Sequence, residues 1–106
     1  MKKYKVEITS SAFRDINLIY EYIKYDLMLS EYADRLIERI FQNINSLEYY
    51  PKKYSKIDIQ SEKLLDIRRV IVDKYLILYV VEPNRVIVTD IVYGASNFDK
   101  HLNIKK

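Results

Sequence analysis

The stretch Ile67–Gly94 constrains the fold of this chain more than any other. It contains three runs rich in Val, Ile, Leu and Tyr, and two polar breaks separate them, Asp73-Lys74 and Pro83-Asn84. Apolar runs of this length between short polar breaks predict three antiparallel strands joined by tight turns. The stretch also holds the only glycine of the chain and the pair Arg68-Arg69.

Both alternating sets of side chains in the first two runs are apolar. Successive side chains of a strand point to opposite faces of a sheet. Counted straight through the first break, one set is Ile71, Tyr75, Ile77, Tyr79 and Val81, and the other is Val70, Val72, Leu76, Leu78 and Val80. A sheet with one wet face would alternate polar and apolar residues, so we expect both faces to be covered. Helices can cover one face, and the residues after Gly94 can cover part of the other. We expect the remainder of that face to be an exposed apolar patch that marks a binding site. The alternative is that strand twist and the loop Lys52–Asp66 bury this patch internally.

The N-terminal half predicts one strand and two helices. Tyr4–Thr9 alternates between apolar and polar residues, as a half-buried strand does. Apolar residues then recur every three or four positions from Ala12 to about Asp26, which predicts an amphipathic helix. A second helix of the same kind is expected from its N-cap at Ser30 to near Tyr50, before Pro51. The short gap between the two helices makes them an antiparallel hairpin.

The predicted order is β-α-α-β-β-β. A helix hairpin packed on a mainly antiparallel sheet belongs to the α+β class. The first strand must pair with the other three, because a lone strand leaves its backbone groups unpaired. Lys52–Asp66 has no period and reads as a loop with one helical turn around Ser61–Leu65. Residues 95–106 are expected to start a short helix or to trail off as a tail.

Composition limits the classes of function. A chain of 106 residues fits one domain, residues 1–106, with one core. No cysteine is present, which excludes a thiolate nucleophile and a cysteine-based metal site, and the single histidine has no second ligand beside it. We therefore expect neither metal nor cofactor. The absence of a long apolar run and of a signal-peptide pattern predicts a cytoplasmic protein without a membrane partner.

Basic residues near the centre of the chain are the candidate contacts for an acidic partner. Seven lysines and arginines lie between Lys52 and Lys74, with four carboxylates among them. Together with nearby tyrosines they fit either an RNA-contact surface or a solvated loop of mixed charge. Arg68 is the strongest candidate for a target phosphate or a partner carboxylate; the alternative is an ion pair with Asp66 or Glu62. Tyr93 is a weaker candidate for catalysis, with edge packing as its alternative.

An ordered set of segments over nearly the whole chain resembles the RelE/ParE superfamily of type II toxin–antitoxin toxins. The segments are Tyr4–Thr9 with Ser11-Ala12 and Asp15-Ile16, Ile19–Ile23, Ser46-Leu47 leading to Tyr50-Pro51, Ile67–Arg69, Tyr75–Val81, and Ile91–Ala95 with Phe98 and Leu102 beyond. The resemblance implies the β-α-α-β-β-β fold. It also implies a small cytoplasmic toxin linked to growth inhibition and plasmid stabilization. Its partner would be a cognate antitoxin that wraps the toxin and covers the second apolar face.

The superfamily has two branches, and the resemblance favours the ParE-like one. RelE-like members cleave mRNA on the ribosome without a metal, using basic residues, whereas ParE-like members poison DNA gyrase. Arg68 matches one basic position of the nuclease branch, but the other catalytic positions hold Val70, Leu76, Ser96 and Phe98. These four side chains supply neither the cations nor the acid and base that attack by a 2′-hydroxyl requires. The long helix hairpin and His101-Leu102 are also more similar to ParE-like toxins.

The resemblance therefore implies a ParE-like toxin that acts by binding a protein, with DNA gyrase as the target. The alternative is a ribosome-dependent mRNA endoribonuclease with an atypical site, and a third reading is a toxin fold that only binds its partner. A homodimer or a hetero-oligomer with the antitoxin is compatible with each of these readings. The atypical nuclease site would use Arg68, Lys52, Lys53 and Tyr93. The residues expected to contact target or antitoxin are Arg68, Val70, Val72, Leu76, Leu78, Lys52, Lys53, Ser96 and Phe98.

Overall fold

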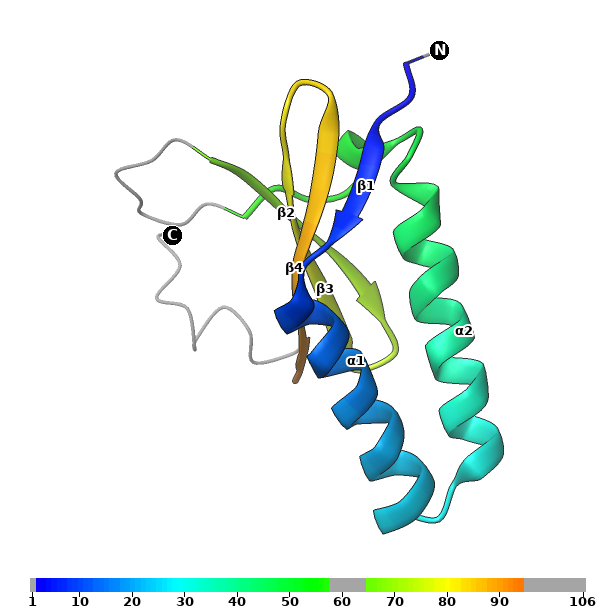
Figure 1. Ribbon diagram of the computed structural model, residues 1–106. Coiled ribbons are helices and arrows are strands. Elements are labelled where there is room, and N and C mark those ends of the chain that lie inside the picture. Colours follow the sequence, from blue (N-terminus) through cyan, green and yellow to red (C-terminus); the bar gives the residue numbers. More distant parts are fainter. Residues whose placement is uncertain (1, 58–64, 95–106) are drawn as a thin grey trace.

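A computed structural model describes residues 2–57 and 65–94 of the chain (Figure 1). The elements are β1 (Lys5–Ile8), α1 (Ser10–Glu21) with a π-helical turn (Tyr22–Asp26), α2 (Ser30–Ser46), a 3-10 turn (Pro51–Lys53), β2 (Asp66–Val72), β3 (Tyr75–Val81) and β4 (Arg85–Tyr93). The predicted order β-α-α-β-β-β is confirmed, as is the α+β class, with two helices packed on a four-stranded sheet. No helix in the described part of the chain has the length and apolar character needed to cross a membrane.

The sheet has the strand order β1-β4-β3-β2. β2, β3 and β4 form the expected antiparallel meander, and β1 pairs in parallel with β4. The helix hairpin leads from β1 to β2 at the opposite edge of the sheet, so the connection between the parallel strands β1 and β4 consists of the hairpin, β2 and β3. Asp73 takes a positive φ of 54° in the tight turn between β2 and β3, a conformation that Asp tolerates better than most residues.

The predicted division of side chains between the two faces of the sheet is wrong across this turn. Val72 pairs with Tyr75 and Ile71 with Leu76, and directly paired residues share a face. The alternation therefore changes phase at Asp73-Lys74, because a two-residue turn pairs even positions with odd ones. Val70 and Val72 lie under the helices with Tyr75, Ile77, Tyr79 and Val81, whereas Leu76 and Leu78 belong to a separate cluster with Ile57.

The first helix begins at Ser10, two residues before the apolar period that starts at Ala12, and its last turn is not α-helical. Thr9 is the N-cap, and its hydroxyl accepts a hydrogen bond from the Ala12 amide at 3.0 Å. The α-helical geometry stops at Glu21, and the expected last turn is π-helical, with the Leu27 amide bonded to the Tyr22 carbonyl. Met28 then takes a positive φ of 57° in the connection to α2.

Both ends of the second helix differ from the expectation. Ser30 is the first helical residue rather than the N-cap, because Leu29 occupies the cap position without a side-chain bond. The helix ends at Ser46, four residues before the predicted end. There the backbone tightens to bonds between residues three apart, and the Ser46 hydroxyl donates to the Asn43 carbonyl. Pro51 does not cap this helix but begins the following 3-10 turn.

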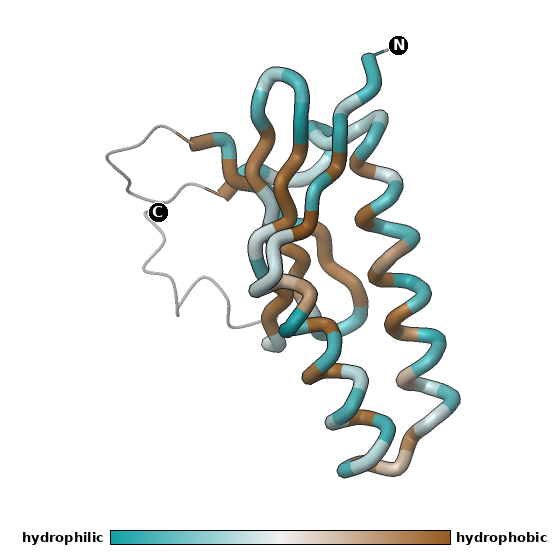
Figure 2. Tube along the Cα trace, in the orientation of Figure 1, coloured by the Kyte–Doolittle hydropathy of each residue, from teal (hydrophilic) through white to brown (hydrophobic). Residues whose placement is uncertain are grey.

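The main core lies between the helix hairpin and one face of the sheet. Ala12, Ile16 and Ile23 of the first helix meet the buried stripe of α2, which is Ala33, Leu36, Ile40 and Ile44. Figure 2 shows the expected contrast: the helices alternate between polar and apolar residues, whereas long stretches of the strands are apolar throughout. Because the hairpin shields only one face, the other face depends on what the remaining chain or a partner supplies.

The 3-10 turn is attached to the sheet by Tyr79. Its hydroxyl is buried and donates to the Pro51 carbonyl at 2.6 Å, and burial raises the pKa of Tyr79 far above its ordinary value. We expect Tyr79→Phe to lower the free energy of unfolding by about 1–2 kcal/mol, because the Pro51 carbonyl loses its donor while remaining buried. Urea denaturation followed by circular dichroism measures this change. An unchanged midpoint would contradict it.

Candidate functional site

Arg68 is held by four hydrogen bonds at the start of β2. Its Nε and Nη2 atoms donate to the two carboxylate oxygens of Asp66 at 2.9 and 3.4 Å. Its Nη1 atom donates to the carbonyl oxygens of Tyr54 at 2.8 Å and Lys52 at 3.2 Å. The Arg68 side chain is 16% exposed and that of Asp66 is 23% exposed. The guanidinium therefore joins the strand to the segment that follows the 3-10 turn.

The same segment also pairs with the outer edge of β2. The Ile57 amide donates to the Ile67 carbonyl at 2.7 Å, and the Arg69 amide donates to the Ser55 carbonyl at 3.2 Å. A guanidinium that donates two hydrogen bonds to the two oxygens of one carboxylate makes a strong, directional contact. Of the two readings of Arg68, the ion pair with Asp66 is the one that the structure contains. Its positive charge is matched and most of its donors are used within the chain.

The other residues expected to join Arg68 do not gather around it. Lys52 and Lys53 are exposed on the 3-10 turn beside it, but Val70 and Val72 are buried under the helices. Tyr93 pairs with Tyr75, whereas Arg68 pairs with Tyr79, four residues away along β3. That separation is about 13 Å, so Tyr93 and Arg68 do not form one site. Ser96 and Phe98, like the helical turn predicted around residues 61–65 apart from Leu65, lie outside the described residues.

The second face of the sheet is largely closed at its centre. Leu76 is 0% exposed and Leu78 is 9% exposed, and they form a cluster with Ile57, against which Ile67 and Val92 pack. Ile71, the cross-strand neighbour of Leu76, is 58% exposed. Within the described residues, the exposed apolar surface on this face is therefore narrower than the alternation predicts.

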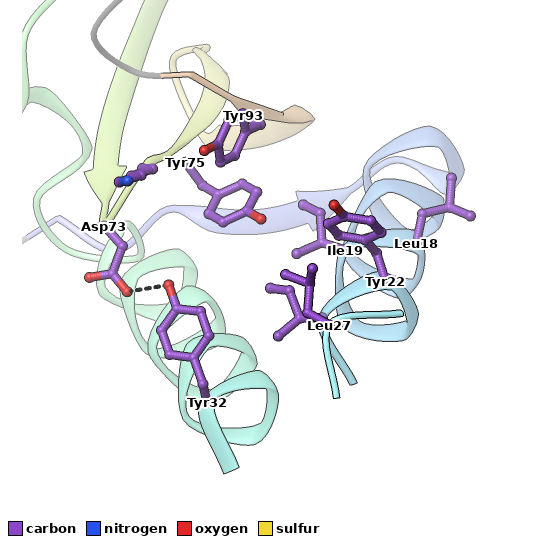
Figure 3. Close-up of a pocket in the computed structure, with 10 residues that line it drawn as sticks. Leu18, Ile19, Tyr22, Leu27, Tyr32, Asp73, Tyr75 and Tyr93 are labelled. Atoms are coloured by element: carbon purple, nitrogen blue, oxygen red, sulfur yellow. Dashed lines mark hydrogen bonds between the residues drawn. The ribbon is translucent and has the colours of Figure 1, made fainter. Parts of the chain in front are cut away.

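A groove of about 870 Å³ opens between the end of the helix hairpin and the sheet (Figure 3). Its lining is mainly apolar and aromatic, and four of its ten residues are tyrosines. Tyr75 and Tyr93 approach from the sheet, and Leu18, Tyr22 and Leu27 approach from the hairpin. Leu18, Tyr22, Leu27 and Tyr93 are exposed, so the groove is an apolar surface open to solvent.

Asp73 fixes one side of this groove. Its carboxylate accepts from Arg39 at 2.6 Å and from the Tyr32 hydroxyl at 3.0 Å, which ties the β2–β3 turn to α2. The hydrogen bond from Arg39 lowers the pKa of Asp73 below its ordinary value, although burial acts in the opposite direction. Burial and the bond to Asp73 raise the pKa of Tyr32, so its hydroxyl stays protonated and donates at neutral pH.

The contact of Asp73 with Arg39 predicts a pH-dependent stability. Because the pKa of Asp73 is lower in the folded state, the contact stabilises the fold above the unfolded pKa and is lost as pH falls through the folded pKa. We expect wild type to be more stable than Asp73→Asn at pH 7, and this advantage to shrink steadily as the pH falls below the ordinary pKa of 3.8. Urea midpoints of both proteins across this range measure the effect. Asparagine keeps the positive φ accessible, so a constant difference at all pH values would contradict the prediction.

The chemistry of the groove is that of binding rather than proton transfer. Tyr75 and Tyr93 pack edge to face, with ring centroids 5.2 Å apart. Burial, with the neighbouring Tyr93 and Tyr22, raises the pKa of Tyr75, so its hydroxyl is a poor base at neutral pH. Across residues 2–57 and 65–94, no three side chains of the metal-binding types come together. An apolar segment with hydrogen-bond acceptors is what these tyrosines suit.

The sequence does not predict this groove because its residues belong to separate predicted elements. Tyr22 lies within the predicted first helix, whereas Tyr75 lies in a predicted strand. The available signal was the run of apolar residues around the hairpin connection. Tyr22, Tyr25, Leu27, Met28 and Leu29 cannot all face one core, and all five are exposed. Only the packing of the hairpin on the sheet shows that Tyr93 lies across from them.

Residues 6–98 match the model of a family described as "ParE toxin of type II toxin-antitoxin system, parDE". No curated protein matches the chain. Three solved structures share the fold at low identity. A chain of the chromosomal ParDE system from P. aeruginosa is 16% identical, with a TM-score of 0.69, and the match covers 87% of this chain and 97% of that one. A chain of the RelBE2 toxin–antitoxin complex from Mycobacterium tuberculosis is 17% identical, with a TM-score of 0.63 and coverage of 90% and 95%. A chain of the archaeal RelE–RelB complex from Pyrococcus horikoshii OT3 is 16% identical, with a TM-score of 0.59 and coverage of 88% and 96%.

Proposed function

The chain belongs to the ParE toxin family of type II toxin–antitoxin systems, and from that premise we propose that it acts by binding DNA gyrase rather than by cleaving RNA. The observation that carries the proposal is that the Arg68 guanidinium is hydrogen-bonded to Asp66 and to backbone carbonyls of its own chain. Arg68 is the one cation at the positions where the nuclease branch of the superfamily holds its basic groups, and it is neutralised by Asp66 at 2.9 Å.

The geometry around Arg68 does not suit phosphate chemistry. Cleavage by a 2′-hydroxyl needs a base, an acid and cations placed where charge develops. Losing even one such stabilising donor typically costs about 100-fold in rate. Val70 is buried under the helices and Leu76 is buried on the opposite face, so neither position offers a polar group to a bound RNA. A toxin that works by occupying a protein surface needs none of these groups.

The partner that controls the toxin is proposed to be a cognate antitoxin. The three similar structures come from toxin–antitoxin systems or complexes, which supports a protein partner for this fold. The toxin would act in the cytoplasm, inhibit growth when free, and be neutralised when bound. A plasmid that carried the genes of both toxin and antitoxin would thereby be stabilised in the cell population.

A supercoiling assay tests the proposal. Relaxed plasmid, gyrase and ATP are incubated with increasing amounts of the purified chain. We expect supercoiling to be lost, or linear DNA from trapped cleavage complexes to appear, as the chain approaches the gyrase concentration. The product of an adjacent small reading frame, added first, should restore supercoiling. Unchanged supercoiling at a large excess of folded chain would overturn the gyrase target.

A matched variant keeps the assay specific. Leu76→Ala is expected to destabilise the fold strongly (see Discussion), so it serves as an unfolded control at a temperature above its midpoint. Arg68→Lys keeps the charge but loses the bidentate geometry that holds Asp66. If Arg68 has only a structural role, Arg68→Lys should lower the free energy of unfolding. Gyrase inhibition per folded molecule should stay the same.

A further inference from the structure

The chain leaves the sheet at the mouth of the groove. Tyr93, the last residue of β4, and Lys74 both line it. The Gly94 amide donates to the Lys74 carbonyl at 2.9 Å, which fixes the exit point beside the β2–β3 turn. Gly94 takes a φ of +91°, a conformation that lets the backbone turn away from the strand direction and that other residues adopt only with strain. Residues 95–106 therefore begin within reach of the groove.

The outer rim of the groove carries two carboxylates, with Lys24 between them and Lys74 on the sheet side. Glu21 and Asp26 are exposed at the end of the first helix, where they border a shallow depression with Leu18, Tyr22 and Tyr25. Neither carboxylate forms an ion pair within the described residues. Lys24, between them, donates to the Tyr20 hydroxyl. An occupant with apolar side chains and nearby positive charge would match both the lining and the rim.

The twelve residues after Gly94 have this character. Phe98 and Leu102 are four positions apart in the sequence, and Ile104 follows. Lys100, Lys105 and Lys106 outweigh Asp99, so the segment carries a net charge of +2 with His101 neutral. Three residues separate Gly94 from Phe98, so Phe98 lies within at most about 14 Å of the exit point.

We propose that residues 95–106 dock in the groove between the helix hairpin and the sheet, with Phe98 and Leu102 between Tyr22, Leu27 and Tyr93. The lysines of the segment then lie near Glu21 and Asp26. A short tether gives the segment an effective concentration in the millimolar range, which a separate chain seldom reaches. This intramolecular occupant therefore has the advantage over a second copy of the chain. The inference does not depend on the gyrase target, because it concerns the isolated toxin.

Docking of this segment would make the groove a regulated surface. A partner chain that uses the groove must first release residues 95–106. The apparent affinity of the partner for the toxin is then reduced in proportion to the fraction of toxin in which the segment is undocked. Removal of the segment should expose Leu18, Tyr22, Leu27 and Tyr93 together. Such a patch favours self-association or capture by another apolar segment.

Paramagnetic relaxation tests the placement directly. The chain has no cysteine, so Asn103→Cys provides a single site for a nitroxide label on the full-length protein. Methyl groups of Leu18 and Leu27 report on the groove, and those of Leu76 and Leu78 report on the opposite face of the sheet. We expect the groove methyl signals to lose most of their intensity relative to the reduced label. The signals of Leu76 and Leu78 should lose less, and that of Leu47, just past the far end of α2, should lose least.

Three results would overturn the proposal. Stronger broadening at Leu76 and Leu78 than at Leu18 and Leu27 would place the segment on the opposite face. No selective broadening would leave the groove open for a partner chain. Broadening that persists when spin-labelled and isotope-labelled chains are separate molecules in one sample would assign the groove to a second copy.

A paired variant controls for folding. Phe98→Ser with Leu102→Ser, carried in the Asn103→Cys background, removes both apolar anchors outside the described core. We expect the groove signals to recover their intensity while the remaining methyl spectrum keeps its dispersion. Unchanged broadening in this variant would show that these two side chains do not hold the segment, and would overturn the proposed contact.

Discussion

Replacing Arg68 with alanine is expected to lower the free energy of unfolding by about 2–4 kcal/mol. The substitution leaves the Asp66 carboxylate without its cation, and it removes a donor from the carbonyl oxygens of Lys52 and Tyr54. The pair is only slightly exposed, so solvent screening reduces the effect little. Urea denaturation at pH 7, followed by circular dichroism, measures the change.

Arg35→Ala is the matched control for Arg68→Ala. Arg35 also pairs with a carboxylate, Glu31 at 3.9 Å, but both side chains are largely exposed on α2. An exposed pair of this kind contributes less than about 0.5 kcal/mol. If Arg68→Ala changed stability by no more than Arg35→Ala, the guanidinium would not be a structural contact. It would then be available to a phosphate or to an antitoxin carboxylate.

Replacing Leu76 with alanine is expected to cost about 2–5 kcal/mol of unfolding free energy. Leu76 is completely buried on the sheet face opposite the helices, so truncation leaves a cavity among Ile57, Leu78 and their neighbours. The cross-strand neighbour Ile71 provides the control, since it is exposed and lies on the same face. Ile71→Ala should cost less than about 1 kcal/mol.

The comparison of Leu76→Ala with Ile71→Ala decides what the second face is. A large difference between the two variants means that the chain covers the centre of this face itself. Equal and small losses of unfolding free energy would mean that Leu76 is accessible in the free protein, as expected for a surface that an antitoxin covers. In that case, Leu76→Ala should weaken antitoxin binding without unfolding the toxin.

Periodicity predicted the elements of the fold because each one buries a continuous stripe. The spacing of Ala33, Leu36, Ile40 and Ile44 gave α2, and the polar breaks at Asp73-Lys74 and Pro83-Asn84 gave the strand order of the meander. The ends of the helices were less accessible to this reasoning. The π-helical turn after Glu21 and the tightened end at Ser46 depend on local backbone hydrogen bonds that apolar spacing does not encode.

The error in assigning sheet faces has a simple geometrical cause. Alternation holds within one strand, but a hairpin pairs residues whose numbers add to a constant, here 147, as for Val72 with Tyr75. Even and odd positions therefore exchange faces at the turn. Pairs counted outward from Asp73-Lys74 put Val70 and Val72 on one face with Tyr75 and Ile77, and Leu76 and Leu78 on the other. The register does not say which face the helices cover; in the structure it is the face of Val70 and Val72.

The candidate site was harder to predict than the fold. That Arg68 could pair with Asp66 was visible from their spacing on one strand face, two residues apart. The two carbonyl acceptors come from the segment after Pro51, and nothing in the sequence indicates that this segment returns to the edge of β2. The groove likewise requires residues from the first helix, α2, the β2–β3 turn and β4 to meet.

We propose that this toxin leaves RNA intact, and primer extension tests this proposal most directly. The assay uses mRNA from a purified translation system, run with and without the folded chain. We predict full-length extension products at every toxin concentration that blocks gyrase. New 5′ ends within codons positioned in the ribosomal A site, absent without the chain and lost in Arg68→Ala, would contradict the account.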